Sequence, residues 1–343
     1  MVAQMNHEIG RSPLPEKLDQ ETWASLLKEA TLSIGGAKAW HWFSHHFSML
    51  PPHALGRSIV DACADCEKKL PGLGFQFIKD IAAICGKEKH EPHYDQLLQK
   101  LAELLVLRKL LTLDWPAGTT FQHEPAVSAA GKRPELRVVT PDRSFLFEVK
   151  TPSLLEHIRA RRTNAFQVAG RALPMALVEK LIGDGRLTLP RDNPVKDFLL
   201  DADKKFAQFK VVQAETSVLV IVWDDFIYEP ITVLKHEQCG LLTANSYLKD
   251  ATGAAVRFAH VDAVVVVRHL TYLYRAAGDQ PLRERAHALD FGDEHALPNV
   301  FIPISDAGLV PDRIRQGLRA VSWDDPLLQR AADYRPKDIV IWA

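Results

Sequence analysis

Two nearly all-apolar runs in the second half of the chain constrain the fold most. The first reads VLVIVW at residues 218–223, and the second reads VDAVVVVRH at residues 261–269. Short runs rich in branched side chains are typical of strands that are buried on both faces of a sheet. Because helical patterns precede both runs, the sequence predicts an α/β fold in which a mixed sheet is flanked by helices.

The character of the chain changes near residue 91. Before this point we find amphipathic helical stretches and no convincing strand. These stretches are broken at Gly35-Gly36, Pro51-Pro52 and Pro71-Gly72, and they cover residues 16–33, 37–49, 53–70 and 75–85. We therefore expect an all-helical accessory lobe over residues 1–90. An α/β domain would follow over residues 91–343, with its core at about 94–270 and a C-terminal extension.

Within the second region, helical and strand patterns alternate. We expect helices at residues 94–111, 153–170, 174–182 and 194–210, and further strands at residues 121–127, 136–139, 145–149 and 299–304. The order is helix, strand, hairpin, helix and buried strand.

Composition limits the classes of function. The chain has 343 residues, of which 47% are hydrophobic and 25% charged, as in ordinary soluble domains. It has no apolar run that could span a bilayer, and residues 1–11 lack the apolar core of a signal peptide. We therefore expect a cytoplasmic protein without a membrane partner. The net charge of −1 gives no support to nucleic-acid binding, although a local basic patch is enough to engage phosphates.

Two motifs in the helical region have a metal interpretation and a structural one. Cys63 and Cys66 form a C-x-x-C, which suggests zinc or redox chemistry, but both fall on an apolar helical stripe. His41 and His45 are four residues apart, which suits a metal on one helix face, but no third ligand has matching spacing. We favour buried thiols in the first case and a packed aromatic helix in the second.

A hairpin at residues 133–150 contains the most informative constellation. Its second strand ends FLFEVK, and alternation along a strand places Glu148 and Lys150 on one face. If Asp142 and Arg143 form a two-residue loop, Glu135 lies across from Lys150 and diagonal to Glu148. A loop of odd length would separate these side chains, so the shared face depends on the turn.

Two carboxylates and a lysine on one face have a clear chemical use. Oxygen ligands of this kind suit Mg²⁺ or Mn²⁺. Such an ion activates water and stabilises charge on a phosphoryl oxygen. The ammonium group of Lys150 would orient the attacking water or neutralise the developing charge.

The segment Pro134-Glu135, twelve residues, then Glu148-Val149-Lys150 resembles the signature of the PD-(D/E)XK nuclease superfamily. Glu135 stands where that family usually has aspartate. Pro141-Asp142 also spells the first motif, but it lies in the expected turn, so we do not assign Asp142 as a ligand. The resemblance covers about residues 94–225 and implies a restriction-endonuclease-like sheet.

The resemblance also implies roles for residues outside the hairpin. Glu103, on the helix before the first strand, corresponds to a third acidic metal contact, and its alternative is an exposed helical glutamate. Further candidates for phosphate contact, each with a solvated helix face as the alternative, are Lys205, Gln208, Arg159, Arg161, Arg162 and Arg171.

The expected function is therefore a metal-dependent endonuclease acting on DNA, and the family suggests defence, restriction or repair. In this hypothesis Glu135, Glu148 and Glu103 hold Mg²⁺ or Mn²⁺, and Lys150 assists catalysis. Residues 1–90 would provide target choice, homodimerisation or docking of a partner protein. One alternative is a nuclease-fold module that binds or scaffolds without cutting. Another is an unrelated α/β domain in which E-V-K is a charge pair on an edge strand.

Overall fold

The computed structural model describes residues 17–127, 131–153, 166–168, 180, 187–188, 193–211, 215–224, 226–293, 295–306, 309–330 and 339–341. The helices are α1 (Lys17–Ala30), which runs on into a π-helical turn (Thr31–Gly35), α2 (Ser44–Phe47), α3 (Ala54–Lys69), α4 (Leu73–Ala83), α5 (Glu91–Leu111), α8 (Asn193–Lys210), α9 (Tyr228–Lys235), α10 (Leu270–Ala277), α11 (Asp312–Gly317) and α12 (Pro326–Arg330). The strands are β1 (Thr120–His123), β2 (Leu136–Val139), β3 (Ser144–Lys150), β4 (Phe166–Val168), β5 (Leu187–Thr188), β6 (Glu215–Trp223), β7 (Ala263–Arg268), β8 (Asn299–Pro303), β9 (Ala320–Ser322) and β10 (Ile339–Ile341).

A seven-stranded mixed sheet forms the centre of the molecule. Its strand order is β1-β2-β3-β6-β7-β8-β9. The β1–β2 and β2–β3 pairs are antiparallel, β3–β6 and β6–β7 are parallel, β7–β8 is antiparallel and β8–β9 is parallel. The predicted α/β class with a mixed sheet is confirmed, and strands β6 and β7 are buried along their whole length, as their composition predicts.

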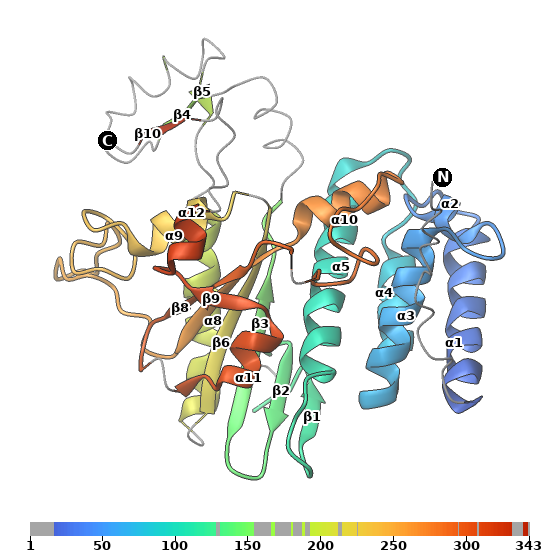
Figure 1. Ribbon diagram of the computed structural model, residues 1–343, viewed down its shortest axis with the longest axis horizontal. Coiled ribbons are helices and arrows are strands. Elements are labelled where there is room, and N and C mark those ends of the chain that lie inside the picture. Colours follow the sequence, from blue (N-terminus) through green and yellow to red (C-terminus); the bar gives the residue numbers. More distant parts are fainter. Residues whose placement is uncertain are drawn as a thin grey trace, which may run out of the picture.

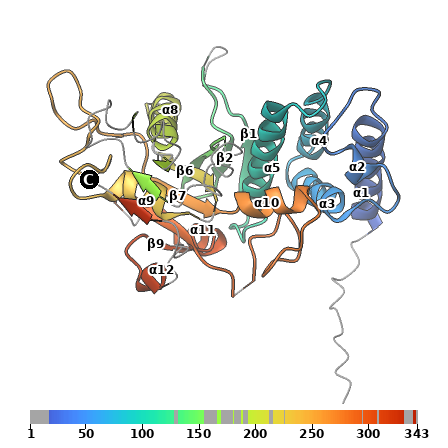
Figure 2. The ribbon, with the colours of Figure 1, turned by 90° about the horizontal axis from the view of Figure 1, so that it is seen from above.

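Helices cover both faces of this sheet (Figures 1 and 2). Alternate residues of β3 divide between two hydrophobic clusters, with Phe145 and Phe147 in one and Leu146 in the other. The first cluster includes α5 and α10, and the second includes α8 and α9. The sheet therefore separates two cores, and the side chains that follow Leu146 in the alternation point to the α8 side.

The helices before residue 91 share a core with the rest of the chain. Among described residues 17–90, every regular element is helical, as predicted. These helices pack on the side of α5 that faces away from the sheet (Figures 1 and 2). Their buried side chains belong to the same hydrophobic cluster as α5 and the side chains of β6 that point toward α5. Helix α5 is buried nearly all round because it lies between the two layers.

The predicted helix at 37–49 is largely wrong, because only α2 is helical in this stretch. The side chain of His41 explains part of the difference. Its Nδ1 accepts the backbone N–H of Phe43 at 2.9 Å, and its Nε2 lies 2.9 Å from the carbonyl oxygen of Ile81. Such local side-chain bonds compete with the helical backbone pattern.

Two other expectations need correction. The strand expected at 121–127 ends at His123, because Glu124 adopts a positive φ of 45° and Pro125 follows. The helix expected at 153–170 is wrong at Phe166–Val168, which pairs as a strand with β5 and β10. Residues 154–165 and most of the helix expected at 174–182 lie outside the described residues.

In the described parts of the chain, no helix combines the length and the apolar character needed to cross a bilayer.

Candidate metal and phosphate site

The hairpin register differs from the prediction by two residues. Leu136 pairs with Phe147, and Val139 pairs with Ser144. The two-residue loop is therefore Pro141-Asp142, and it is closed by the hydrogen bond from the Thr140 N–H to the Arg143 carbonyl oxygen at 2.9 Å. The loop length is even, as predicted, but its centre lies one residue earlier in the chain.

This shift places Glu135 opposite Glu148 instead of opposite Lys150. Glu135 lies directly before β2, and continuing the register by one pair makes Glu148 its partner. A shift of two residues preserves the face on which strand side chains point, so Glu148 and Lys150 keep a common side. The carboxylate of Glu135, which lies before the first residue of β2, lies close to Glu103 of α5 and also interacts with Glu148. Strand β3 lies between β2 and β6, and it is not an edge strand of the sheet; its pairing with β2 ends at Phe147, whereas Glu148 to Lys150 pair with β6.

Glu148 is the centre of a buried ion-pair network. Its side chain is fully buried, and its Oε1 lies 2.9 Å from Lys150 Nζ and 2.5 Å from Lys205 Nζ. Lys205 comes from α8, which covers this face of the sheet, and only 14% of its side chain is exposed. Lys205 is thus a member of the cluster, which overturns its alternative interpretation as a solvated helix residue.

Asp201 completes the network, and the sequence analysis missed it. Its carboxylate lies 2.8 Å from Lys150 Nζ and 2.5 Å from Lys132 Nζ. Burial opposes the effect, but the two lysines lower the pKa of Asp201 to about 2. The available signal was the i, i+4 spacing of Asp201 and Lys205 on α8, which places both on one helix face.

A second cluster joins Glu135 to the helix on the other side of the sheet. Glu103 of α5, His123 of β1 and Glu135 each offer one ligand atom, and these atoms lie within 4.8 Å of one another. Lys100 Nζ lies 2.6 Å from Glu103 Oε2 and 3.5 Å from an oxygen of Asp80. Glu103 is therefore close to the first carboxylate of the motif, as the resemblance implies, and His123 is a member that the sequence analysis did not identify.

The electrostatics of this second cluster favour an added cation. Burial and the nearby carboxylates of Glu103 and Glu148 raise the pKa of Glu135 to about 8. Burial also raises the pKa of Glu103, although Lys100 opposes the shift. Among the described residues, Oε2 of Glu148 and Nε2 of His123 are buried without a hydrogen-bond partner. Such orphaned acceptors beside repelling carboxylates fit a divalent cation.

Comparison of the chain with protein-family models, with curated proteins and with solved structures finds no match in any of the three.

The remaining predicted residues lie outside the two clusters or outside the described chain. Gln208 is half-buried on α8, one turn beyond Lys205, and it takes no part in the ion pairs of Glu148. Asp142 lies in the exposed turn, as predicted. The structure does not describe the candidates for a phosphate-gripping arm, which are Arg159, Arg161, Arg162 and Arg171.

The cysteine motif and His41 of the helical region are buried in the core, as predicted. Cys63 and Cys66 are free thiols with no exposed surface, and burial raises the pKa of both. His41 is buried and bonded to backbone groups. It does not pair with His45.

The raised pKa of Glu135 predicts a pH dependence of stability without metal. Its pKa of about 8 in the fold exceeds the ordinary value of 4.5, so the folded state disfavours the ionised form. The contribution of this group to the free energy of unfolding is therefore neutral below its ordinary pKa. As the pH rises from 4.5 to about 8, ionisation of Glu135 destabilises the folded state progressively. Above this range, the free energy of unfolding is lower by on the order of 2 kcal/mol.

Urea unfolding of the chelator-treated protein at pH 5 and pH 8.5 measures this loss. Glu135→Gln is expected to remove most of the difference between the two pH values. A wild-type protein that gains stability across this range relative to Glu135→Gln would contradict the assignment.

Proposed function

We propose that this chain is a nuclease that depends on Mg²⁺ or Mn²⁺ and hydrolyses phosphodiester bonds of DNA, most simply as an endonuclease. The observation that carries the proposal is the proximity of the carboxylates of Glu135, which lies directly before β2, and Glu148 of β3. This pair joins the Glu103–His123–Glu135 cluster on one side to Lys150 and Lys205 on the other. A carboxylate-rich cation site thus adjoins two ammonium groups.

The arrangement of elements supports a restriction-endonuclease-like core. Helix α5 precedes the β1–β2–β3 antiparallel strands, and α8 precedes β6, which is parallel to β3. This is the order of helix, hairpin, helix and buried strand that the resemblance implies. The motif residues lie on the β2–β3 hairpin, and Lys205 reaches them from α8.

The donor set suits a divalent cation. Glu103, His123 and Glu135 would hold it. The carboxylate of Glu148, whose Oε2 has no hydrogen-bond partner among the described residues, interacts with that of Glu135. When bound, such an ion lowers the pKa of water and stabilises negative charge on a phosphoryl oxygen. Metal binding would also relieve the repulsion that raises the pKa of Glu135.

Lys150 acts in this proposal as a fixed positive charge. Burial lowers its pKa, but the carboxylates of Glu148 and Asp201 outweigh this effect, so the pKa lies above its ordinary value. A lysine that stays protonated at neutral pH is a poor general base. Both roles expected from the sequence, orienting the attacking water and neutralising the developing charge on the phosphodiester, suit a protonated lysine, whereas taking a proton from water does not.

Plasmid nicking in the presence of Mg²⁺ or Mn²⁺ tests the function directly. We expect a chelator to abolish nicking, and Mn²⁺ to support a rate about tenfold higher than Mg²⁺, because His123 contributes an imidazole nitrogen. His123→Asp should reduce this preference by supplying oxygen instead. Equal rates with both ions in both proteins would contradict the role of His123.

A second candidate is a module of the same fold that binds nucleic acid without cutting it. One observation favours it: Oε1 of the fully buried Glu148 already contacts two lysines. Gel-shift titration beside the nicking assay separates the two functions. Salt-dependent DNA binding with no nicking under either ion would support this candidate against the first.

A further inference from the structure

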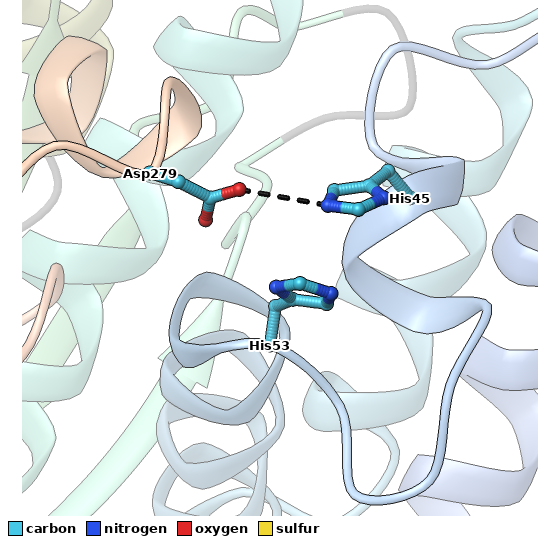
Figure 3. Close-up of side chains that lie close together, drawn as sticks. All are labelled: His45, His53 and Asp279. Carbon is cyan, nitrogen blue, oxygen red and sulfur yellow. Dashed lines mark ion pairs between the residues drawn. The ribbon is translucent and has the colours of Figure 1, made fainter.

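Three polar side chains from distant parts of the sequence meet at the end of the helical region (Figure 3). His45 lies in α2, His53 directly precedes α3, and Asp279 follows α10. Each offers one ligand atom, and these atoms lie within 4.8 Å of one another. The imidazole rings of His45 and His53 have centroids 4.2 Å apart, and the carboxylate of Asp279 faces them.

The distances in this cluster are longer than hydrogen bonds. His45 Nε2 and Asp279 Oδ2 point toward each other but are 3.6 Å apart (Figure 3). Two ligands at about 2.0 Å from a tetrahedral zinc ion are separated by about 3.3 Å. The observed spacing is therefore close to that of ligand atoms sharing one ion, and slightly beyond the reach of a direct hydrogen bond.

A buried histidine beside the cluster points to the same conclusion. His46 is 3% exposed, and its Nε2 lies 3.2 Å from the Ala277 carbonyl oxygen, to which only an N–H can donate. Its Nδ1 then carries a lone pair in the neutral ring, and this atom lies 3.7 Å from Asp279 Oδ1.

The cluster thus gathers imidazole nitrogens beside a carboxylate without hydrogen bonds between them. Among the described residues, neither Nδ1 of His46 nor Nε2 of His53 has a hydrogen-bond partner, and both atoms are buried. Buried acceptors that face a carboxylate are unfavourable unless a cation lies among them. Imidazole nitrogens select transition metals over Mg²⁺, and two histidines with one carboxylate form a common zinc donor set.

We propose that His45, His53 and Asp279 bind one Zn²⁺ ion. The ion would connect the segment before α3 to the segment after α10, which lie far apart in the sequence. Because the three ligands meet only in the folded chain, binding stabilises the native state. This site shares no residue with the Glu103–His123–Glu135 cluster, and it does not depend on the proposed nuclease activity.

Isothermal titration of the full-length protein with Zn²⁺, after removal of metal by chelation, tests the proposal. We compare the wild type with the double variant carrying His45→Asn and His53→Asn, and expect the double variant to lose one equivalent of bound Zn²⁺. Asp279→Asn should weaken the same binding event at least about tenfold. Zn²⁺ at about 100 times its Kd should raise the Tm of the wild type by about 4 °C, and this rise should be absent in the double variant.

His93→Asn is the matched control, because His90 and His93 form another histidine pair, with ring centroids 4.5 Å apart. It should retain the full stoichiometry. His45 and Asp279 are 62% and 47% exposed, so the single variants His45→Asn and Asp279→Asn keep the test valid if the double variant does not fold. A wild type that binds no Zn²⁺, or variants with unchanged affinity, stoichiometry and Tm shift, would overturn the proposal.

Discussion

Glutamine in place of Glu148 is expected to reduce Mn²⁺-dependent plasmid nicking by at least about a thousandfold. The amide oxygen can still accept hydrogen bonds from Lys150 and Lys205, which contact Oε1 in the wild type. The substitution removes the negative charge that faces Glu135 and the proposed cation. The loss should therefore appear mainly in kcat at saturating Mn²⁺, because the fold is retained.

Glu215→Gln provides a close control. Glu215 is also a buried glutamate with an unpartnered Oε2 and a basic partner, Arg137, at 2.5 Å. It lies on β6 opposite Ser144, at the far end of β3 from Glu148. Nicking by Glu215→Gln should stay within about threefold of the wild type. Equal activity of Glu148→Gln and the wild type would refute the assigned site.

Alanine at the same position is expected to lower the free energy of unfolding by about 3 kcal/mol. The reason differs from the catalytic one. Glu148→Ala leaves Lys150 and Lys205, whose side chains are 22% and 14% exposed, with Asp201 as their shared acid partner. Removing one member of a buried ion pair leaves uncompensated charge in a region of low dielectric constant.

Urea unfolding at pH 7, followed by tryptophan fluorescence, measures this change. The double variant Glu148→Ala with Lys205→Met should lose less stability than the sum of the two single variants, because each substitution removes the partner that the other leaves unpaired. Additive losses would show that Glu148 and Lys205 do not stabilise each other. A difference below about 0.5 kcal/mol between wild type and Glu148→Ala would contradict the buried network.

The sequence predicted the strands of the sheet well where a local run of apolar and branched residues is enough to define a strand. The buried strands at 218–223 and 261–269 and the hairpin strands lie close to their expected positions. The hairpin register was wrong by two because Thr140 selects the turn. Its hydroxyl contacts the Arg143 carbonyl oxygen at 2.8 Å and the side chain of Asp142. These contacts close the loop around Pro141-Asp142. Proline is favoured at the second position of such a turn, which is where Pro141 lies.

The site could be predicted only as far as one strand pair extends. Glu148 and Lys150 share a face because side chains alternate along a strand. The contribution of His123 depends on the β1–β2 register, and those of Asp201 and Lys205 depend on where α8 crosses the sheet. These are tertiary relations without a local pattern. The same reason explains why the spacing of His41 and His45 did not lead to His53 and Asp279, with which the structure groups His45.

The position of α5 between the N-terminal helices and the sheet has a consequence for how this protein can vary. A helix that is buried nearly all round cannot lose one neighbour without exposing leucine side chains to water. The described helices of residues 17–90 are therefore not an exchangeable module joined by a linker. Sequence changes in that region are therefore tolerated mainly on its outer surface. Residues that pack against α5 can change only together with their partners on that helix.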